Sequence, residues 1–192
     1  DDAVILIDCG PDFREQMLRA SSFEKIDGVL VTHEHYDHVG GLDDLRPFGR
    51  FADIPIYSDA YTAAHLRARM PYCFVDKVYP GVRVSICRKW RRGRCSTSTG
   101  RKWLPLRVMH GRLPILGYRI GGRLGYITDM HLMPEESYEQ LKGLDVLVMN
   151  ALRPKAASYA PEYFGGVGGC RTYWCQRDLF HPYEPSCRAS CR

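Results

Sequence analysis

Residues 32–41 read Thr32-His33-Glu34-His35-Tyr36-Asp37-His38-Val39-Gly40-Gly41 and place three histidines and one aspartate within six positions. The apolar run 29–31 comes directly before them and predicts a buried strand. Because alternate residues leave a strand on the same side, His33 and His35 can aim at one point. Asp37 and His38 are then expected to aim at a second point beside the first. Imidazole nitrogens and carboxylate oxygens are ligands of zinc, manganese and iron, so the stretch predicts two adjacent metal positions.

Length and composition indicate a globular protein. The chain has 192 residues, 45% of them hydrophobic, which is enough for the core of one domain. The sequence contains no apolar run long enough to span a membrane and no charged-then-apolar leader. We therefore predict a cytoplasmic protein without a membrane partner. A strand pattern begins as early as Val4, with almost nothing before it to pair with, and we expect the N-terminus to be incomplete.

The charge of the chain is unevenly distributed. Between Asp76 and Asp129 there is no acidic residue, whereas Lys and Arg occur thirteen times. A cationic surface favours anionic substrates, either phosphate esters or nucleic acid. The alternative is a basic loop without function.

Hydrophobic periodicity and turn residues predict the remaining elements. The predicted strands cover residues 4–7, 28–32, 54–57, 104–109, 115–120, 125–128 and 145–149. The predicted helices cover residues 12–20, 42–48, 60–70 and 134–141, with Pro47 disturbing the second of them. The strand over 145–149 is the last that the pattern supports.

Two further candidate ligands follow predicted strands. His110 comes after the strand over 104–109, and Asp129 comes after the strand over 125–128. Loops at one edge of a sheet can converge on a common site despite a large separation in sequence. Taken alone, His110 would be a structural histidine and Asp129 a helix cap, but with the cluster at 33–38 they favour one site.

These residues resemble the metallo-β-lactamase fold superfamily. Its hallmark His-x-His-x-Asp-His is matched by His33, His35, Asp37 and His38, and its later ligands by His110 and Asp129. Residues 5–14 and 116–120 look most like the phosphodiesterase branch, which includes the phosphoribosyl cyclic phosphodiesterase of phosphonate breakdown. The resemblance covers residues 4–155. It implies an α/β (α+β) fold, a four-layer αββα sandwich, here incomplete at both termini.

The resemblance also implies a metal site. The first metal would be held by His33, His35 and His110, the second by Asp37 and His38, and Asp129 would bridge both. The cofactors would be two divalent ions, zinc or manganese, with iron as another candidate. A metal-bridging hydroxide would attack phosphorus, Asp37 and Asp129 would be catalytic, and Asp37 would steer the proton. His131 would contact substrate, although a surface histidine is the alternative.

Several features depart from the family. The Gly-rich loop that normally precedes Val4 is absent, and so is a final Thr-His-x-x-His segment, which His181 does not match. Segments 87–102 and 156–192 are rich in Arg, Cys, Gly, Ser and Trp. We interpret both segments as products of reading-frame shifts. The first lies within a domain spanning residues 1–155, and the second follows that domain. The competing interpretation is a genuine insertion and tail.

Three functions remain open. The leading hypothesis is a metal-dependent phosphodiesterase acting on a small or cyclic phosphate ester, in a chain that could form a homodimer. The second is a nuclease of the transfer-RNA 3′-processing type, which would bind RNA through the basic stretch. The third is a non-catalytic remnant whose second metal site lacks a ligand.

Overall fold

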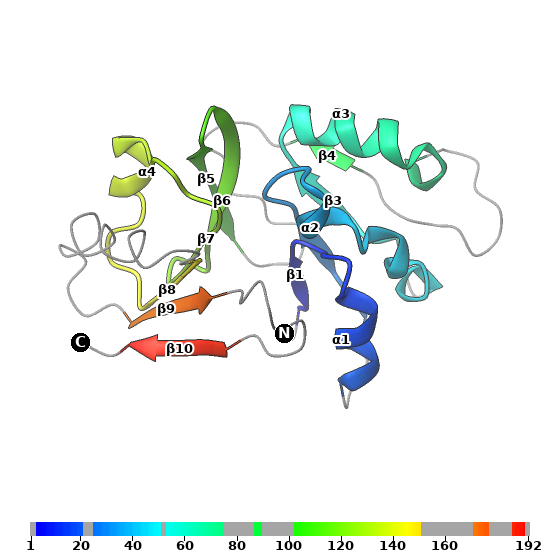
Figure 1. The fold of residues 1–192 in the computed structure, drawn as a ribbon, viewed down its shortest axis with the longest axis horizontal. Helices are drawn as coiled ribbons and strands as arrows, with labels where there is room; N and C mark the ends of the chain where they lie inside the picture. The colour runs from blue at the N-terminus through cyan, green and yellow to red at the C-terminus, as the bar shows by residue number, and fades with distance from the viewer. Residues whose placement is uncertain are drawn as a thin grey trace. The chain divides into compact units, whose positions relative to one another are not determined.

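The computed structural model describes residues 3–20, 25–50, 53–74, 87–89, 102–150, 171–176 and 186–190. The chain divides into two compact units, Asp1–Arg94 and Cys95–Arg192. Each unit contains a β-sheet, with several helices in the first unit and, among its described residues, one helix in the second (Figure 1), which is the mixed α/β composition predicted. Within the described ranges, every helix is too short or too polar to cross a membrane.

The sheet of the first unit is parallel throughout. Its strands are β1 (Ile5–Ile7), β2 (Gly28–Leu30), β3 (Ile56–Ser58) and β4 (Cys87–Lys89), in that order across the sheet. Their register aligns Leu6 with Val29, Val29 with Ile56, and Ile56 with Cys87. All four strands therefore end at the same edge, and the loops that follow β1, β2 and β3 start side by side.

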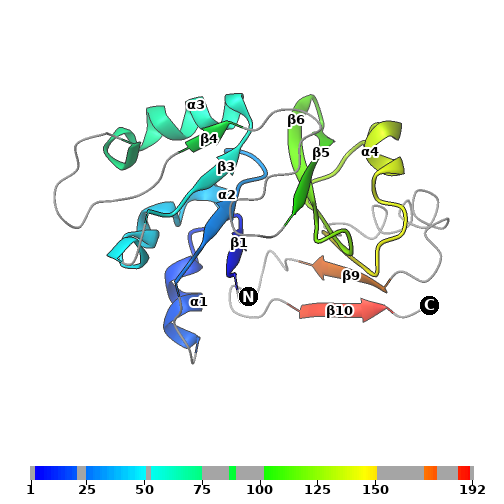
Figure 2. The ribbon, with the colours of Figure 1, turned by 180° about the vertical axis from the view of Figure 1, so that it is seen from behind.

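Helices and 3₁₀ turns accompany this sheet (Figure 2). They are α1 (Phe13–Arg19), α2 (Tyr36–Val39), η1 (Leu42–Leu45), η2 (Phe48–Arg50), α3 (Ala60–Arg69) and η3 (Pro71–Phe74). The predicted helix over 42–48 is wrong, since two 3₁₀ segments occupy that region. Pro47 has no N–H to donate, and the Arg46 N–H bonds three residues back to the Asp43 carbonyl at 3.3 Å.

One apolar cluster joins the sheet to these helices. Val29 and Val31 point to the same face because strand side chains alternate. Phe13 of α1 packs in the same cluster, with its ring centroid 5.9 Å from that of Phe48. Other buried members are Leu42, Leu45, Ile54, Ile56, Ala63 and Leu66.

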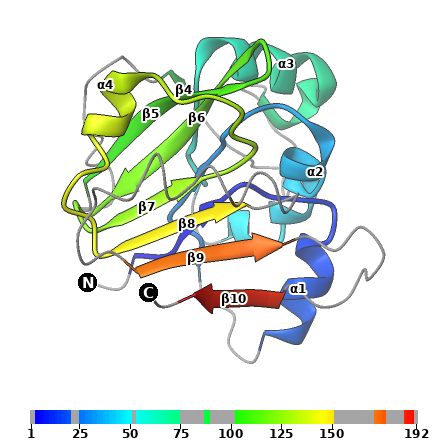
Figure 3. The ribbon, with the colours of Figure 1, turned by 60° about the vertical axis from the view of Figure 1, so that its left-hand side comes forward.

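The second unit is built on a mixed six-stranded sheet. Figure 3 shows its strands side by side in the order β10-β9-β8-β7-β6-β5. The strands are β5 (Trp103–His110), β6 (Leu113–Ile120), β7 (Leu124–Ile127), β8 (Val146–Asn150), β9 (Arg171–Gln176) and β10 (Ser186–Ser190). The helix α4 (Glu135–Glu139) precedes β8. A buried cluster on one side of the sheet contains Leu106, Val108, Ile115, Ile127, Leu141, Leu144 and Leu147.

The prediction that the strand over 145–149 is the last one is wrong. β9 pairs in parallel with β8, and β10 pairs antiparallel with β9. β4 likewise falls inside the segment 87–102 and pairs with β3. The composition of these segments gives only a weak strand signal, because Arg and Cys flank the short β-forming run Thr172-Tyr173-Trp174. The reading-frame interpretation stays a prediction, and His181 lies outside the described residues.

Candidate metal centre

The histidine cluster lies where β2 ends, beside the loop that leaves β1. The Asp8 amide donates to the Leu30 carbonyl at 2.9 Å, and the Cys9 amide donates to the His38 carbonyl at 2.7 Å. The Gly41 amide donates to the Cys9 carbonyl at 2.9 Å. These bonds join the loop after β1 to the end of β2 and to the C-terminal end of α2, and they fix the backbone that carries His38.

Two glycines make this close approach possible. A Cβ on Gly41 would lie 2.1 Å from the Gly10 carbonyl oxygen, and one on Gly10 would lie 2.6 Å from the Asp37 carbonyl oxygen. Both distances are far below van der Waals contact, and both neighbours are backbone atoms. Only glycine at these positions allows the two loops to meet.

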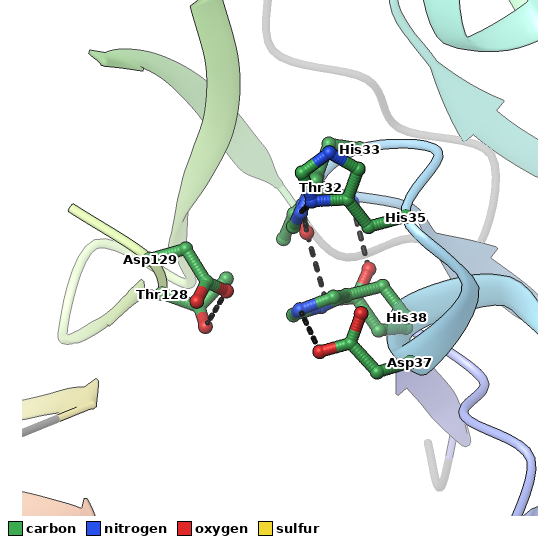
Figure 4. Close-up of polar contacts among 8 residues, drawn as sticks. Thr32, His33, His35, Asp37, His38, Thr128 and Asp129 are labelled. Atoms are coloured by element: carbon green, nitrogen blue, oxygen red, sulfur yellow. Dashed lines mark hydrogen bonds and ion pairs between the residues drawn. The ribbon is translucent and has the colours of Figure 1, made fainter. Parts of the chain in front are cut away.

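His33 and His35 form the first pair of candidate ligands. The His33 Nε2 and His35 Nδ1 atoms lie 3.0 Å apart, and the ring centroids lie 4.5 Å apart (Figure 4). His33 is buried, whereas His35 is exposed. The two rings therefore present nitrogens to one point at the border of the protein interior, as the alternation along the strand predicts.

Asp37 and His38 form the second pair. The His38 Nε2 and Asp37 Oδ2 atoms are 3.3 Å apart (Figure 4). The His38 side chain is buried, while more than half of the Asp37 side chain is exposed. The His33 and His38 ring centroids are 4.1 Å apart, so the two pairs are neighbours.

The residues of both pairs fit a divalent cation. Ligands bound tetrahedrally to zinc at 2.0–2.1 Å lie roughly 3.3–3.4 Å from each other, which is close to both separations. The donor set of imidazole and carboxylate is the one that zinc, manganese and iron accept. The first unit therefore carries a candidate His/Asp metal site.

Within the second unit, His110 and Asp129 lie at the same end of the sheet. His110 is the last residue of β5, and the His131 amide donates to the Met109 carbonyl at 2.8 Å. Asp129 has a φ of 50°, and its Oδ2 accepts a 2.8 Å bond from the Thr128 hydroxyl (Figure 4). A non-glycine residue in the left-handed region is strained, and such strain concentrates at functional sites. His131 is exposed.

Two residues that lie behind the histidines were not predicted from the sequence as part of the site. Asp8 is buried, has a φ of 56°, and accepts bonds from Thr32 and His38. Thr32 is fully buried and contacts His33 Nδ1 through its hydroxyl at 2.9 Å. The signal was present, because Asp8 follows an apolar strand just as Asp129 does.

Cys9 lies in the same loop but is not a candidate ligand in its thiol form. Burial is the main reason that the pKa of Cys9 is raised, and the carboxylates of Asp44, Asp8 and Asp12 raise it further. A metal or an electrophile reacts with the thiolate, which this environment disfavours. Among the described residues, the candidate metal ligands at this site are therefore imidazole nitrogens and carboxylate oxygens.

A sequence profile of the family described as "Beta-lactamase superfamily domain" matches residues 4–166. The chain belongs to this superfamily. The predicted fold class, an α/β fold of the metallo-β-lactamase type, is thereby confirmed, and membership supports a hydrolase that binds divalent metal. The matched range begins where the resemblance was predicted to begin and extends past residue 155.

Individual relatives refine this membership. A crystal structure described as a new diphosphatase from the PhnP family is 34% identical, with a TM-score of 0.79, and the match covers 91% of this chain and 68% of that one. An octanoyltransferase from Porphyromonas gingivalis is 42% identical over 78% of this chain and 30% of its own length. A ribonuclease Z from Rippkaea orientalis is 30% identical over 76% of this chain and 49% of its own length. The chain thus spans less than half of these two curated relatives. The profile gives the superfamily, and the similarity to the diphosphatase structure puts the chain near the PhnP branch of it.

Proposed function

We propose that the chain is a metal-dependent phosphodiesterase that acts on a small or cyclic phosphate ester. The observation that carries this proposal is the pair of ligand sets at the end of β2, in a chain 34% identical to a PhnP-family diphosphatase. The chain spans 30% of the octanoyltransferase, so the activity in that protein's name need not reside in the matched part.

The ligand assignment follows the superfamily order. His33, His35 and His110 would hold one ion, Asp37 and His38 a second, and Asp129 would contact both. Two bound divalent ions lower the pKa of coordinated water and neutralise charge on the phosphoryl oxygens. Zinc and manganese suit this donor set, and iron is also compatible with it.

The protein's own groups then have distinct roles. The half-exposed Asp37 carboxylate can accept and orient the proton of an attacking water at its Oδ atoms. Thr128 holds the Asp129 carboxylate in one orientation through the 2.8 Å hydroxyl bond. His131 is exposed near the end of β5 and can donate a hydrogen bond to an anionic substrate.

Replacement of Asp129 tests this function. D129A should abolish metal-dependent hydrolysis of bis-p-nitrophenyl phosphate, because a carboxylate that would hold the ions is lost. D145A is the matched control, since Asp145 is an exposed aspartate of the same unit paired with Arg123. Turnover of D129A equal to that of the wild type would remove Asp129 from the assignment.

Two other phosphoryl substrates have specific support. The PhnP-family relative is described as a diphosphatase, which favours a diphosphate linkage such as that of a nucleoside diphosphate sugar. The match to ribonuclease Z and the thirteen basic residues between 77 and 128 favour RNA. Side-by-side assays of a phosphodiester, a diphosphate and an RNA with a 3′ trailer separate these substrate classes.

Metal content separates an enzyme from a remnant. About two ions per chain by elemental analysis would support the hydrolase, and zero or one would support a remnant with an incomplete second site. Sedimentation would test the proposed homodimer. Cytoplasmic localisation stays a prediction.

A further inference from the structure

One exposed aromatic side chain lies between the two pairs of candidate ligands. Within residues 31–39, only His35, Tyr36 and Asp37 are exposed. His35 belongs to the first ligand pair and Asp37 to the second. Tyr36 is 63% exposed, although it is a large aromatic residue. It therefore lies on the solvent-facing border of the candidate metal site.

A contact with Gly40 fixes the position of the Tyr36 ring. Residues Tyr36–Val39 form α2, and the Gly40 amide donates to the Tyr36 carbonyl at 2.7 Å, one helical turn back. A Cβ on Gly40 would lie 2.9 Å from both Cε2 and Cζ of Tyr36. The ring thus occupies the space that a side chain at position 40 would need, and it packs on the backbone there.

The backbone that carries Tyr36 is held on both sides. Before it, the Arg69 guanidinium donates from Nη1 to the Glu34 carbonyl at 3.3 Å. After it, the Cys9 amide donates to the His38 carbonyl at 2.7 Å. A side chain that is already positioned loses little conformational entropy when a ligand packs on it. Tyr36 is therefore preorganised for a contact with a ligand.

The chemistry of this ring defines the group that it can bind. The face of a tyrosine ring stacks on other planar aromatic groups. Nucleobases stack on such side chains whatever their hydrogen-bonding pattern, because every base has a π-face. The contact would therefore select for an aromatic ring rather than for one particular base. The ligand pairs on either side of Tyr36 would bind the phosphate of the same molecule.

We propose that Tyr36 is a specificity residue on which a planar aromatic group of the substrate stacks. This group, a nucleobase or an aryl ring, is attached to the phosphate and takes no part in the reaction. The phosphate half of the ligand rests on the proposed function, whereas the aromatic half rests on the exposed ring and its contact with Gly40. The substrate class is thereby narrowed to phosphate esters that carry an aromatic group.

Calorimetric titration of the full-length, zinc-loaded protein tests this role. Adenosine 5′-monophosphate (AMP) and ribose 5-phosphate carry the same phosphate on the same sugar and differ in the base. Loss of a stacking side chain lowers affinity about 5–100-fold, so the wild type should prefer AMP by about that factor and Y36A should lose the preference. The affinity for ribose 5-phosphate should not change. Equal affinity of the wild type for the two compounds would overturn the proposal.

Phenyl phosphate distinguishes the two sources of the aromatic group. If Y36A weakens the binding of AMP but not of phenyl phosphate, the group is a nucleobase. If it weakens both equally, the group is any aryl ring. An unchanged affinity of Y36A for both compounds would show that nothing stacks on Tyr36.

Three further variants control for other effects of the mutation. Y36F keeps the ring and should bind AMP like the wild type, and an affinity as low as that of Y36A would assign the contact to the hydroxyl and overturn stacking. Y72A should keep the preference for AMP, because Tyr72 is an exposed tyrosine of the same unit whose hydroxyl bonds to Asp43 at 3.1 Å. If Y36A does not fold, Y36L decides, and wild-type affinity of Y36L for AMP would overturn the proposal.

The binding test is separate from the test of the proposed function. If the wild type prefers AMP but cleaves no phosphodiester, the proposed reaction is wrong and the role of Tyr36 stands. If it cleaves bis-p-nitrophenyl phosphate without preferring AMP over ribose 5-phosphate, the reaction stands and the role of Tyr36 is wrong.

Discussion

Gly41→Ala should destabilise the protein and disrupt the cluster, because this position has no space for a methyl group. The new Cβ would lie 2.1 Å from the Gly10 carbonyl oxygen and 2.9 Å from the Phe13 Cβ. The backbone would have to move, and the 2.9 Å bond from the Gly41 amide to the Cys9 carbonyl would break. Overpacking costs about 1–3 kcal/mol and the lost bond about 0.5–1.5 kcal/mol. We expect a total loss of about 2–4 kcal/mol.

Thermal unfolding followed by circular dichroism measures this loss. For a chain of this length, about 2–4 °C of melting temperature corresponds to each kcal/mol, so the midpoint should fall by roughly 5–15 °C. Zinc affinity should fall as well, because the broken bond belongs to the loop whose Cys9 amide holds the His38 carbonyl. A variant that instead binds zinc as tightly as the wild type would show that the loops do not depend on this contact.

Gly143→Ala is the matched control. Gly143 has a φ of 73°, but an added Cβ would meet no atom within 4 Å. It therefore imposes only the cost of alanine in a left-handed conformation, about 1–2 kcal/mol. G143A should melt a few degrees lower and retain full zinc affinity. If G41A and G143A behave alike, the reasoning from close approach is refuted.

Three other predictions concern single side chains. D59A should lower stability by about 0.5–2 kcal/mol in urea unfolding, because the Asp59 carboxylate caps α3 through the Thr62 amide at 2.8 Å, and D59N should recover most of that loss. Burial raises the pKa of Asp27, but hydrogen bonds from Lys25 and a backbone amide lower that pKa below 3.8 overall. The stability that Asp27 contributes is therefore present at neutral pH and disappears as the pH falls below about 4. D27N should therefore be less stable than the wild type at pH 7 and equal to it at pH 2, and a constant difference would contradict this account. H131A should leave metal content unchanged by elemental analysis, and a loss of metal would make His131 a ligand.

Local patterns were sufficient for most elements of the fold. β6 and α3 were predicted within two residues of their observed bounds, because apolar periodicity is a short-range signal. Residues 42–50 were not predicted correctly. The sequence shows that Pro47 disturbs a helix there, but it does not decide between an interrupted α-helix and two 3₁₀ segments. β4, β9 and β10 were missed because their composition is atypical and their pairing is non-local.

The sequence by itself identified the chemistry of the cluster at residues 32–41. Three histidines and an aspartate at this spacing after a strand predict metal binding, and alternation along a strand predicts that His33 and His35 act together. Only the tertiary structure showed that Asp8, more than twenty residues away, accepts from Thr32 and His38. Parallel pairing of β1 with β2 brings the two strand ends together, and no short-range pattern encodes that pairing.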